Sequence, residues 1–352
     1  MVALLDLVQT LTTPHPVDRY LELVRPMLTV RDMRARIVAV DRSVPGTISL
    51  GLRPTRQWDG LRAGQFLQLG VVIDGVRHLR CYSPVNSQHD RRRRLDLTLR
   101  VHPHGLVSRY LHEHARPGMI VDLEPASGVF HLPDRRPERV LLISGGSGIT
   151  PVLSMLRTLV DERYSGEVVF LHYARSPELV PHRGELAEIA AAHANIAVEL
   201  RYPEQDGRGF DRDELVRVAP WFADAQTYLC GPPPLMDSVR EVYAATELSE
   251  RLHTEEFVAT TAPVDSADVA GATTFSASGV TAENTGSSLL EQAEGAGLRP
   301  EFGCRMGICF SCTSVRRSGC TRNLRTGELE SDPDQPIQLC VQAAVGDVDI
   351  EI

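Results

Sequence analysis

Five of the seven cysteines lie in the last fifty residues, and their spacing is the clearest chemical signal in this sequence. Four residues separate Cys304 from Cys309, two separate Cys309 from Cys312, and Cys340 follows 28 positions later. Four thiolates at this spacing can hold two irons and two sulfides, with three ligands on one tight loop and the fourth on a distant segment. We therefore predict that these four cysteines bind a 2Fe-2S cluster.

Two alternatives for the cysteine cluster are a disulfide framework and a structural zinc site. Disulfides are disfavoured because the cysteines are crowded together and no secretion signal is apparent. Zinc sites usually combine paired Cys-x2-Cys knuckles or histidines, and no histidine follows His253. Cys320 falls outside the ligand spacing, and we interpret it as a packing residue.

A second group of residues is suited to holding a flavin. Arg80-Cys81-Tyr82-Ser83 ends an alternating run, and Pro84 after it stops regular strand pairing. Arginine offers a fixed charge to a flavin phosphate, tyrosine a flat face to the isoalloxazine ring, and serine a hydroxyl near its N5 atom. Downstream, Gly105-Leu106-Val107-Ser108 opens an expected helix whose free amides can hold a pyrophosphate. An ordinary strand end and a simple helix cap are the alternatives.

Two later turns are suited to a nucleotide. Gly145-Gly146-Ser147-Gly148-Ile149-Thr150-Pro151 follows an apolar strand and opens a helix, where backbone amides can cradle a phosphate. Pro151 replaces the third glycine of a conventional dinucleotide fingerprint, so that fingerprint is not matched. Cys230-Gly231-Pro232 follows another expected strand, and ligands collect at the carboxyl ends of such strands.

The choice between NADPH and NADH depends on charge beside the second and third strands of the expected sheet. A 2'-phosphate needs a cation there, whereas a carboxylate favours NADH. Arg175 and Arg201 stand at these strand ends, ahead of Glu178 and Glu204. We expect NADPH to be preferred, with NADH as a possible donor, and ligand-free surface arginines are the alternative.

The elements that would position these residues fall into distinct stretches. Residues 34–135 show short alternating runs broken by Gly, Pro and Asp, which is typical of a small antiparallel β-barrel. Residues 136–258 alternate strand, glycine turn and helix, as an α/β domain with a parallel sheet does. Residues 259–271 suit a flexible linker, because they are rich in Ala, Thr, Pro and Asp without periodicity. Residues 272–352 form a separate α+β module that carries the cysteine loop.

The net charge and the hydropathy of the chain disfavour some classes of binding partner. With 37 Lys and Arg against 46 Asp and Glu, the net charge of −9 argues against a nucleic-acid partner. Residues 1–33 carry short amphipathic stretches, which we interpret as a helical extension packed on the next domain. The alternative for these residues is, at most, a peripheral contact with a membrane surface. We expect a cytoplasmic protein, because neither a long apolar run nor a signal sequence is apparent.

The C-terminal stretch resembles the plant-type ferredoxin family. The resemblance runs from Phe275 through Cys304-Arg-Met-Gly-Ile-Cys309-Phe-Ser-Cys312 to Cys340 and covers about the last 80 residues. It implies a β-grasp fold around the 2Fe-2S cluster. The family commonly has an apolar strand residue at the place of Cys320.

Four segments resemble, in this order, the ferredoxin-NADP reductase superfamily over about residues 34–258: Arg80–Ser83, Gly105–Ser108, Gly145–Pro151 and Cys230–Met236. The resemblance implies that the first two segments bind FAD and that the third binds the nucleotide pyrophosphate, with Cys230 and Gly231 at the nicotinamide. It also places Glu256 and Phe257 over the flavin or nicotinamide. The catalytic residues it implies are Ser83, Cys230 and Glu256.

The whole order, reductase first and ferredoxin last, resembles actinobacterial oxygenase and desaturase reductases, including those that serve stearoyl-CoA desaturase. It implies an NAD(P)H-dependent oxidoreductase that passes electrons from NADPH through FAD and the cluster to a protein acceptor. The segments 13–20 and His172–Pro177 favour a membrane fatty acyl desaturase as that acceptor. The alternatives are a steroid or aromatic-ring hydroxylase, or a redox sensor without turnover.

Overall fold

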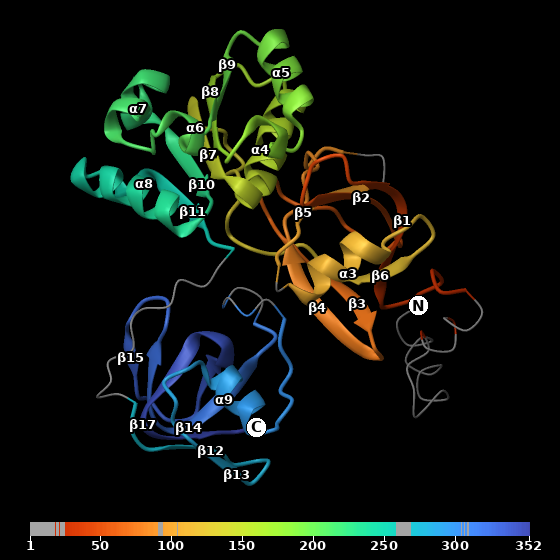
Figure 1. The fold of residues 1–352 in the computed structure, drawn as a ribbon, viewed down its shortest axis with the longest axis vertical. Coiled ribbons are helices and arrows are strands. Elements are labelled where there is room, and N and C mark those ends of the chain that lie inside the picture. The colour runs from red at the N-terminus through yellow and green to blue at the C-terminus, as the bar shows by residue number, and fades with distance from the viewer. Residues whose placement is uncertain are drawn as a thin grey trace. The chain divides into compact units, whose positions relative to one another are not determined.

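The computed structural model describes residues 18, 21, 25–90, 94–103, 105–257, 269–303, 305, 307 and 310–352 of the 352 (Figure 1). The chain divides into two compact units, a larger one of residues 1–78 and 82–256 and a smaller one of residues 79–81 and 257–352. No helix within the described ranges is long and apolar enough to cross a membrane. Most of the expected N-terminal extension 1–33 and linker 259–271 lies outside these ranges.

The larger unit begins with an antiparallel sheet of order β4-β3-β6-β1-β2-β5. Its strands are β1 (Met33–Asp41), β2 (Thr47–Pro54), β3 (Leu67–Ile73), β4 (Val76–Tyr82), β5 (Leu95–Arg100) and β6 (Ile120–Leu123). The sheet curls around a core that includes Ile48, Leu69 and Leu97, and helix α3 (Leu106–His114) packs against this core through Val107 and Leu111. The predicted barrel is therefore confirmed as an antiparallel half-barrel.

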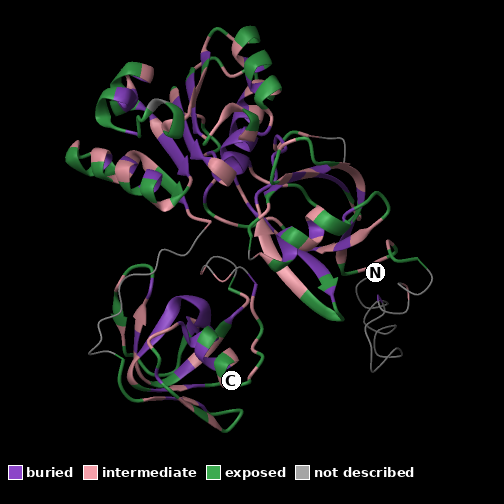
Figure 2. Ribbon diagram, viewed as in Figure 1, coloured by how far each residue is buried: buried purple, intermediate pink, exposed green. Residues whose placement is uncertain are grey.

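A parallel sheet of order β11-β10-β7-β8-β9 follows in the same unit. Its strands are β7 (Arg139–Gly145), β8 (Glu167–Tyr173), β9 (Ile196–Arg201), β10 (Gln226–Cys230) and β11 (Leu252–Glu255). The central strands are apolar and buried on both faces, as Figure 2 shows in purple, because helices cover both sides.

Helices flank this sheet on either side (Figure 1). They are α4 (Ile149–Asp161), α5 (Arg183–Ala192), α6 (Pro203–Asp206), α7 (Arg212–Val218) and α8 (Pro233–Ala245). Residues of α7 and α8 share a core with Leu141, Ile143 and Leu171 of the sheet. Because the strands are parallel, their carboxyl ends form one edge, and the predicted nucleotide turns follow β7 and β10 at that edge.

The smaller unit is a mixed sheet of order β13-β12-β17-β14-β15, with β16 paired to β14. Its elements are β12 (Ala272–Phe275), β13 (Val280–Glu283), α9 (Leu289–Gly295), β14 (Thr313–Asn323), β15 (Leu329–Glu330), β16 (Gln335–Gln338) and β17 (Gln342–Ile350). Strands β12 and β17 are parallel, and α9 packs on the sheet through Leu289 and Leu290. Ser288 and Glu291 form a capping box that fixes where α9 begins. The β-grasp prediction is confirmed.

Candidate functional site

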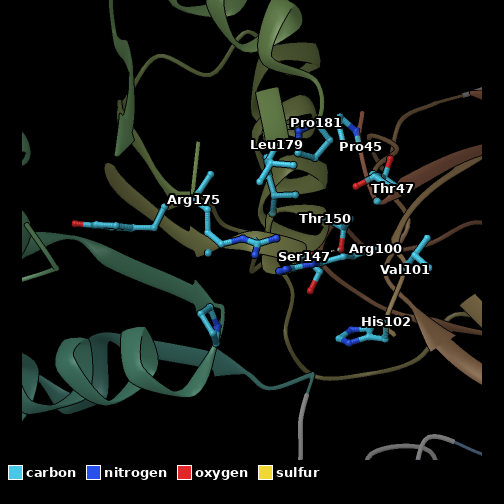
Figure 3. Close-up of a pocket in the computed structure, with 18 of the residues that line it drawn as sticks. Pro45, Thr47, Arg100, Val101, His102, Ser147, Thr150, Arg175, Leu179 and Pro181 are labelled. Atoms are coloured by element: carbon cyan, nitrogen blue, oxygen red, sulfur yellow. Dashed lines mark hydrogen bonds between the residues drawn. The ribbon is translucent and has the colours of Figure 1, made fainter. Parts of the chain in front are cut away.

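A cavity of about 650 Å³ opens at the carboxyl edge of the parallel sheet, between that sheet and the half-barrel (Figure 3). The sheet side contributes the turn after β7 and Arg175 after β8. The half-barrel side contributes Thr47, Arg100 and His102. The cavity is therefore lined by both halves of the larger unit, as a site for transfer between two bound groups requires.

The two predicted nucleotide turns lie directly against each other. A Cβ atom on Gly148 would lie 2.1 Å from the carbonyl oxygen of Cys230, and one on Gly145 would lie 2.7 Å from Pro232. Only glycine permits these approaches. Gly146 has a φ of +54° and begins the single 3-10 turn that leads into α4. The close approach brings the phosphate-cradling amides at the start of α4 beside the end of β10.

Arginines approach the glycine turn from both sides of the cavity. A Cβ atom on Gly146 would lie 3.2 Å from Nη1 of Arg100, at the end of β5. Figure 3 shows Arg175 extending from the sheet side and Arg100 from the half-barrel side toward Ser147. Two guanidinium groups beside free helix amides fit the negative charges of a nucleotide's phosphates. The sequence analysis missed Arg100, because only the folded half-barrel brings it to this turn.

The predicted flavin residues lie at the end of β4. Tyr82 is half-buried and packs on the half-barrel core, and Ser83 is buried. Nη1 of Arg80 donates to the carbonyl of Leu79 at 2.7 Å. These positions fit a flavin ring lying beside the end of β4, with a cation two residues before the tyrosine.

The Gly105–Ser108 segment forms the N-terminus of α3. Gly105 is extended, and no side chain in the described part of the chain caps this helix end. The hydroxyl of Ser108 accepts from the amide of His102 at 3.2 Å and donates to the carbonyl of Gly105 at 3.3 Å. The backbone amides of Leu106 and Val107 at this uncapped end fit a pyrophosphate.

A buried carboxyl group reaches the predicted flavin serine. The hydroxyl of Ser83 donates to Oε2 of Glu255 at 3.5 Å, a long hydrogen bond. Burial raises the pKa of Glu255 to about 8, although the bond from Ser83 opposes this rise. Glu255 pairs in register with Cys230, whose thiol pKa is raised well above its ordinary value, first by burial and then by Glu255 and Glu256. A neutral carboxyl, a neutral thiol and a hydroxyl therefore gather here at pH 7.

The structure brings Glu255 rather than the predicted Glu256 to Ser83. Successive side chains of an extended segment point to opposite sides, so neighbouring glutamates at the end of β11 have different surroundings. The carboxylate of Glu256 pairs with Arg240 of α8. Phe257 is half-buried at the end of a described stretch. Sequence spacing alone could not distinguish the two glutamates.

Two of the four predicted cluster ligands are described. Cys312 and Cys340 are 3% and 6% exposed, and the amide of Leu339 donates to the carbonyl of Cys312 at 3.1 Å. A Cβ atom on Gly307 would lie 2.9 Å from the side chain of Val341, so the cysteine loop lies against the segment that carries Cys340. Cys304 and Cys309 are outside the described residues, and no metal-binding group of three side chains occurs within them. Cys320 is half-buried in β14, opposite Val345.

Residues 46–132 match the oxidoreductase FAD-binding domain family, and residues 142–241 match the oxidoreductase NAD-binding domain family. The chain is 37% identical to an NADPH oxidoreductase of Mycobacterium tuberculosis, over 99% of this chain and 92% of that protein. This chain is an NAD(P)H oxidoreductase of the ferredoxin reductase family.

Two further similarities extend along most of the reductase. It is 28% identical to the glycine betaine monooxygenase reductase subunit of Pseudomonas aeruginosa, over 82% of this chain and 87% of that protein. Its fold is similar to that of phthalate dioxygenase reductase, with a TM-score of 0.65 at 25% identity, covering 91% of this chain and 97% of that structure. Both similarities reach beyond the FAD-binding and NAD-binding domains.

The two arginines expected to select the nucleotide have different surroundings in the reductase. Arg175 lines the cavity, whereas Arg201 bonds to Glu214 at 2.6 Å and to Glu199 at 2.8 Å. Burial would lower the pKa of Arg201, but hydrogen bonds to these carboxylates outweigh burial and raise it. The charge of Arg201 is thus compensated inside the domain, and the geometry favours Arg175 as the partner of a 2'-phosphate.

We expect Arg175→Ala to raise KM for NADPH by roughly tenfold or more, because one charge-assisted hydrogen bond contributes about 1.5–3 kcal/mol. KM for NADH should change by less than about twofold, since NADH has no 2'-phosphate. Steady-state ferricyanide reduction with each nucleotide measures both constants. Arg201→Ala is the matched control and should leave the ratio of the two constants unchanged. An equal rise for NADPH and NADH in Arg175→Ala would remove Arg175 from nucleotide selection.

Proposed function

We propose that this reductase accepts a hydride from NADPH at FAD and passes electrons one at a time through a 2Fe-2S cluster to an oxygenase. The cavity between glycine turn and half-barrel is the observation that carries the proposal, because the turn after β7 lines it from one side and the end of β5 from the other. The fold similarity to phthalate dioxygenase reductase supports an iron-sulfur module after the two nucleotide domains.

The flavin is held by the half-barrel in this proposal. Arg80 supplies charge to a phosphate, Tyr82 a flat surface to the ring, and the amides of residues 105–108 a site for the pyrophosphate. FAD supplies the chemistry that converts a two-electron donor into single-electron steps. The protein orients the ring, excludes water and holds a proton on Glu255 beside Ser83 at neutral pH.

The nicotinamide nucleotide is held across the cavity. The glycine turn with Arg100 binds the diphosphate, Arg175 binds the 2'-phosphate, and the contact between Gly148 and Cys230 shapes the place for the nicotinamide. Cys230 is fully buried, so its neutral thiol fills space beside the ring without adding a charge.

The cluster would be held by Cys304, Cys309, Cys312 and Cys340. Cys312 and Cys340 lie in an apolar core beside a loop containing Gly307, which fits a group that needs thiolates and close backbone amides. We propose domain limits of 34–135, 136–258 and 272–352, with a linker at 259–271. The starts of β1, β7 and β12 at residues 33, 139 and 272 support them.

An oxygenase has more support as electron acceptor than the desaturase favoured by the sequence. The names of two similar proteins state the enzyme that each one reduces, a monooxygenase for one and a dioxygenase for the other. In the segment 13–20 only Asp18 is described, and its carboxylate accepts from the amides of residues 30–32 at 2.6–2.8 Å. His172 is fully buried and bonds to Ser144. Asp18 and His172 therefore have structural roles, which say nothing about the acceptor.

Reconstitution distinguishes the two acceptors. The purified reductase is mixed with NADPH and one of two acceptors, a terminal oxygenase component or a membrane desaturase in phospholipid vesicles. The amount of NADPH consumed is then compared with the amount of product formed. We expect coupled turnover with the oxygenase component. Product with the desaturase alone would overturn the proposed acceptor while leaving the internal electron path intact.

A further inference from the structure

Helix α4 carries three polar side chains that bond to one backbone segment of the half-barrel. We call Ser154, Arg157 and Thr158 the α4 clamp. Its bonds join Ser154 Oγ to the carbonyl of Asn86 at 2.5 Å, Arg157 Nη1 to the carbonyl of Val85 at 2.6 Å, and the amide of Gln88 to Thr158 Oγ1 at 3.1 Å. Ser154 and Thr158 are fully buried, and the bond from Ser154 forms away from solvent.

The clamped segment is itself held firmly on the half-barrel. The amide of Val85 donates to the carbonyl of Asp96 at 2.9 Å, and the side-chain oxygen of Asn86 accepts from the amide of Asp96 at 2.6 Å. The side-chain amide of Asn86 donates to the carbonyl of Arg94 at 3.1 Å. The carbonyls that the clamp engages therefore belong to a segment that the half-barrel also holds by its own hydrogen bonds.

Arg157 of the α4 clamp is also held by hydrogen bonds to the neighbouring helix α5. Arg157 makes two hydrogen bonds to Glu185 of α5, at 2.7 and 2.5 Å. His182, at the start of α5, lies 3.5 Å from the same carboxylate, and its Nε2 is 2.8 Å from Oγ1 of Thr98 on β5. A half-buried arginine that makes two hydrogen bonds to one carboxylate has little rotamer freedom, so the position of α4 is transmitted to the half-barrel.

The clamp connects the two binding sites by a short route. On one side, α4 begins in the glycine turn, and Thr150 precedes Ser154 by one turn, a rise of about 6 Å at 1.5 Å per residue. On the other side, Val85 follows the flavin residue Ser83 by two positions. A displacement of α4 against this segment would move the nucleotide site relative to the flavin site by a similar amount.

We propose that Ser154, Arg157 and Thr158 are positioning residues that set the distance between the nicotinamide and the flavin; this role rests on the proposed function. In the transfer, the C4–H bond of the nicotinamide breaks and its electron pair and hydrogen form the N–H bond at flavin N5. Transfer needs the reacting atoms about 3–3.5 Å apart, and a misplacement of about 1 Å can slow it roughly 100-fold. Losing the clamp should therefore slow transfer without weakening nucleotide binding.

Arg157→Met is the main test, because methionine keeps much of the side-chain volume and removes every donor. Rapid-mixing measurements without oxygen should show flavin reduction at saturating NADPH slowed by roughly tenfold or more, with Kd for NADPH within about twofold. The deuterium isotope effect on this step should rise. Arg157→Lys should recover part of the rate, since lysine can still donate to the Val85 carbonyl, and Ser154→Ala should give a smaller loss.

Hydrogen exchange supplies a readout independent of activity. In the full-length protein, amides of residues 85–90 and of α4 should exchange faster in Arg157→Met and Ser154→Ala. Arg139→Gln is the matched control, because Arg139 also bonds two carboxylates, Glu167 and Asp224, at the opposite end of β7. It should change neither exchange in these segments nor the reduction rate.

Three results would overturn the proposal. They are faster exchange with an unchanged reduction rate, a rate loss that disappears at higher NADPH concentration, and an equal loss in Arg139→Gln. If Arg157→Met does not fold, Arg157→Lys and Ser154→Ala decide by the same criteria. Absence of bound flavin in the wild-type protein would instead refute the proposed function, and the exchange measurement would still show whether the clamp holds the two domains together.

Discussion

Cys312→Ser is expected to abolish the cluster's visible absorbance and paramagnetic signal, and to lower NADPH-dependent cytochrome c reduction by on the order of 100-fold. Cys312 is buried among apolar residues, and a serine hydroxyl is a poor substitute for a thiolate ligand of iron. NADPH-dependent ferricyanide reduction should stay within about twofold, because the nucleotide turns, Tyr82 and Ser83 belong to the other compact unit. Absorbance, paramagnetic resonance and the two acceptor assays on one preparation measure all four quantities.

Cys320→Ser is the matched control for this loss. Cys320 lies in the same module but in β14, outside the ligand spacing. We expect it to keep the cluster spectrum and both activities. A lost spectrum in Cys320→Ser, or lost ferricyanide reduction in Cys312→Ser, would contradict the ligand assignment or the separation of the two units.

Glu255→Gln is expected to remove a large pH dependence of stability. Burial raises the pKa of Glu255 from 4.5 to about 8, so between these values the folded protein holds a proton that the unfolded chain has released. Stability therefore falls as pH rises from about 4.5 to 8, by up to about 1.4 kcal/mol per pH unit and on the order of 5 kcal/mol in total. Urea unfolding of wild-type and variant protein from pH 5 to 9 measures this difference.

The same change should alter the pH profile of hydride transfer. Above about pH 8 the wild-type carboxyl ionises beside Ser83 and places a negative charge where the flavin gains electrons, so the reduction rate should fall. Glu255→Gln should lack this fall. Glu256→Gln, at the neighbouring position paired with Arg240, should follow the wild-type profiles. Identical stability profiles in wild type and Glu255→Gln would show that Glu255 is not buried as a neutral acid.

Local sequence patterns predicted the three-part fold because each part has its own periodicity. Alternating runs predicted the half-barrel, and the apolar strand followed by glycines at Gly145 predicted the start of the parallel sheet. The β-grasp fold was implied by the resemblance of the cysteine segment to plant-type ferredoxins. Gly148 and Cys230 could also be predicted as site residues from local sequence, because both lie at the carboxyl ends of strands in a parallel sheet, where ligands bind.

Residues that act across the fold could not be found this way. Arg100 reaches the glycine turn only when the half-barrel lies against the parallel sheet. Ser154, Arg157 and Thr158 have the spacing of one helix face and look like a solvent-facing stripe until the half-barrel covers them. Arg201 shows the reverse case. Its position at a strand end predicts contact with a ligand, but its guanidinium group forms ion pairs with Glu199 and Glu214. Ion pairs of this kind depend on contacts in the folded domain, which cannot be predicted from local sequence patterns.

The most direct test of the electron path is an anaerobic titration of the purified protein with NADPH and, separately, with NADH. Flavin absorbance, cluster absorbance and the low-temperature paramagnetic resonance signal are followed together. We predict rapid flavin bleaching by NADPH, then a rhombic signal from the reduced cluster, with both changes slower or weaker for NADH. Flavin bleaching without a cluster signal would contradict the proposed electron path, and no bleaching with either nucleotide would contradict the flavin and nucleotide sites.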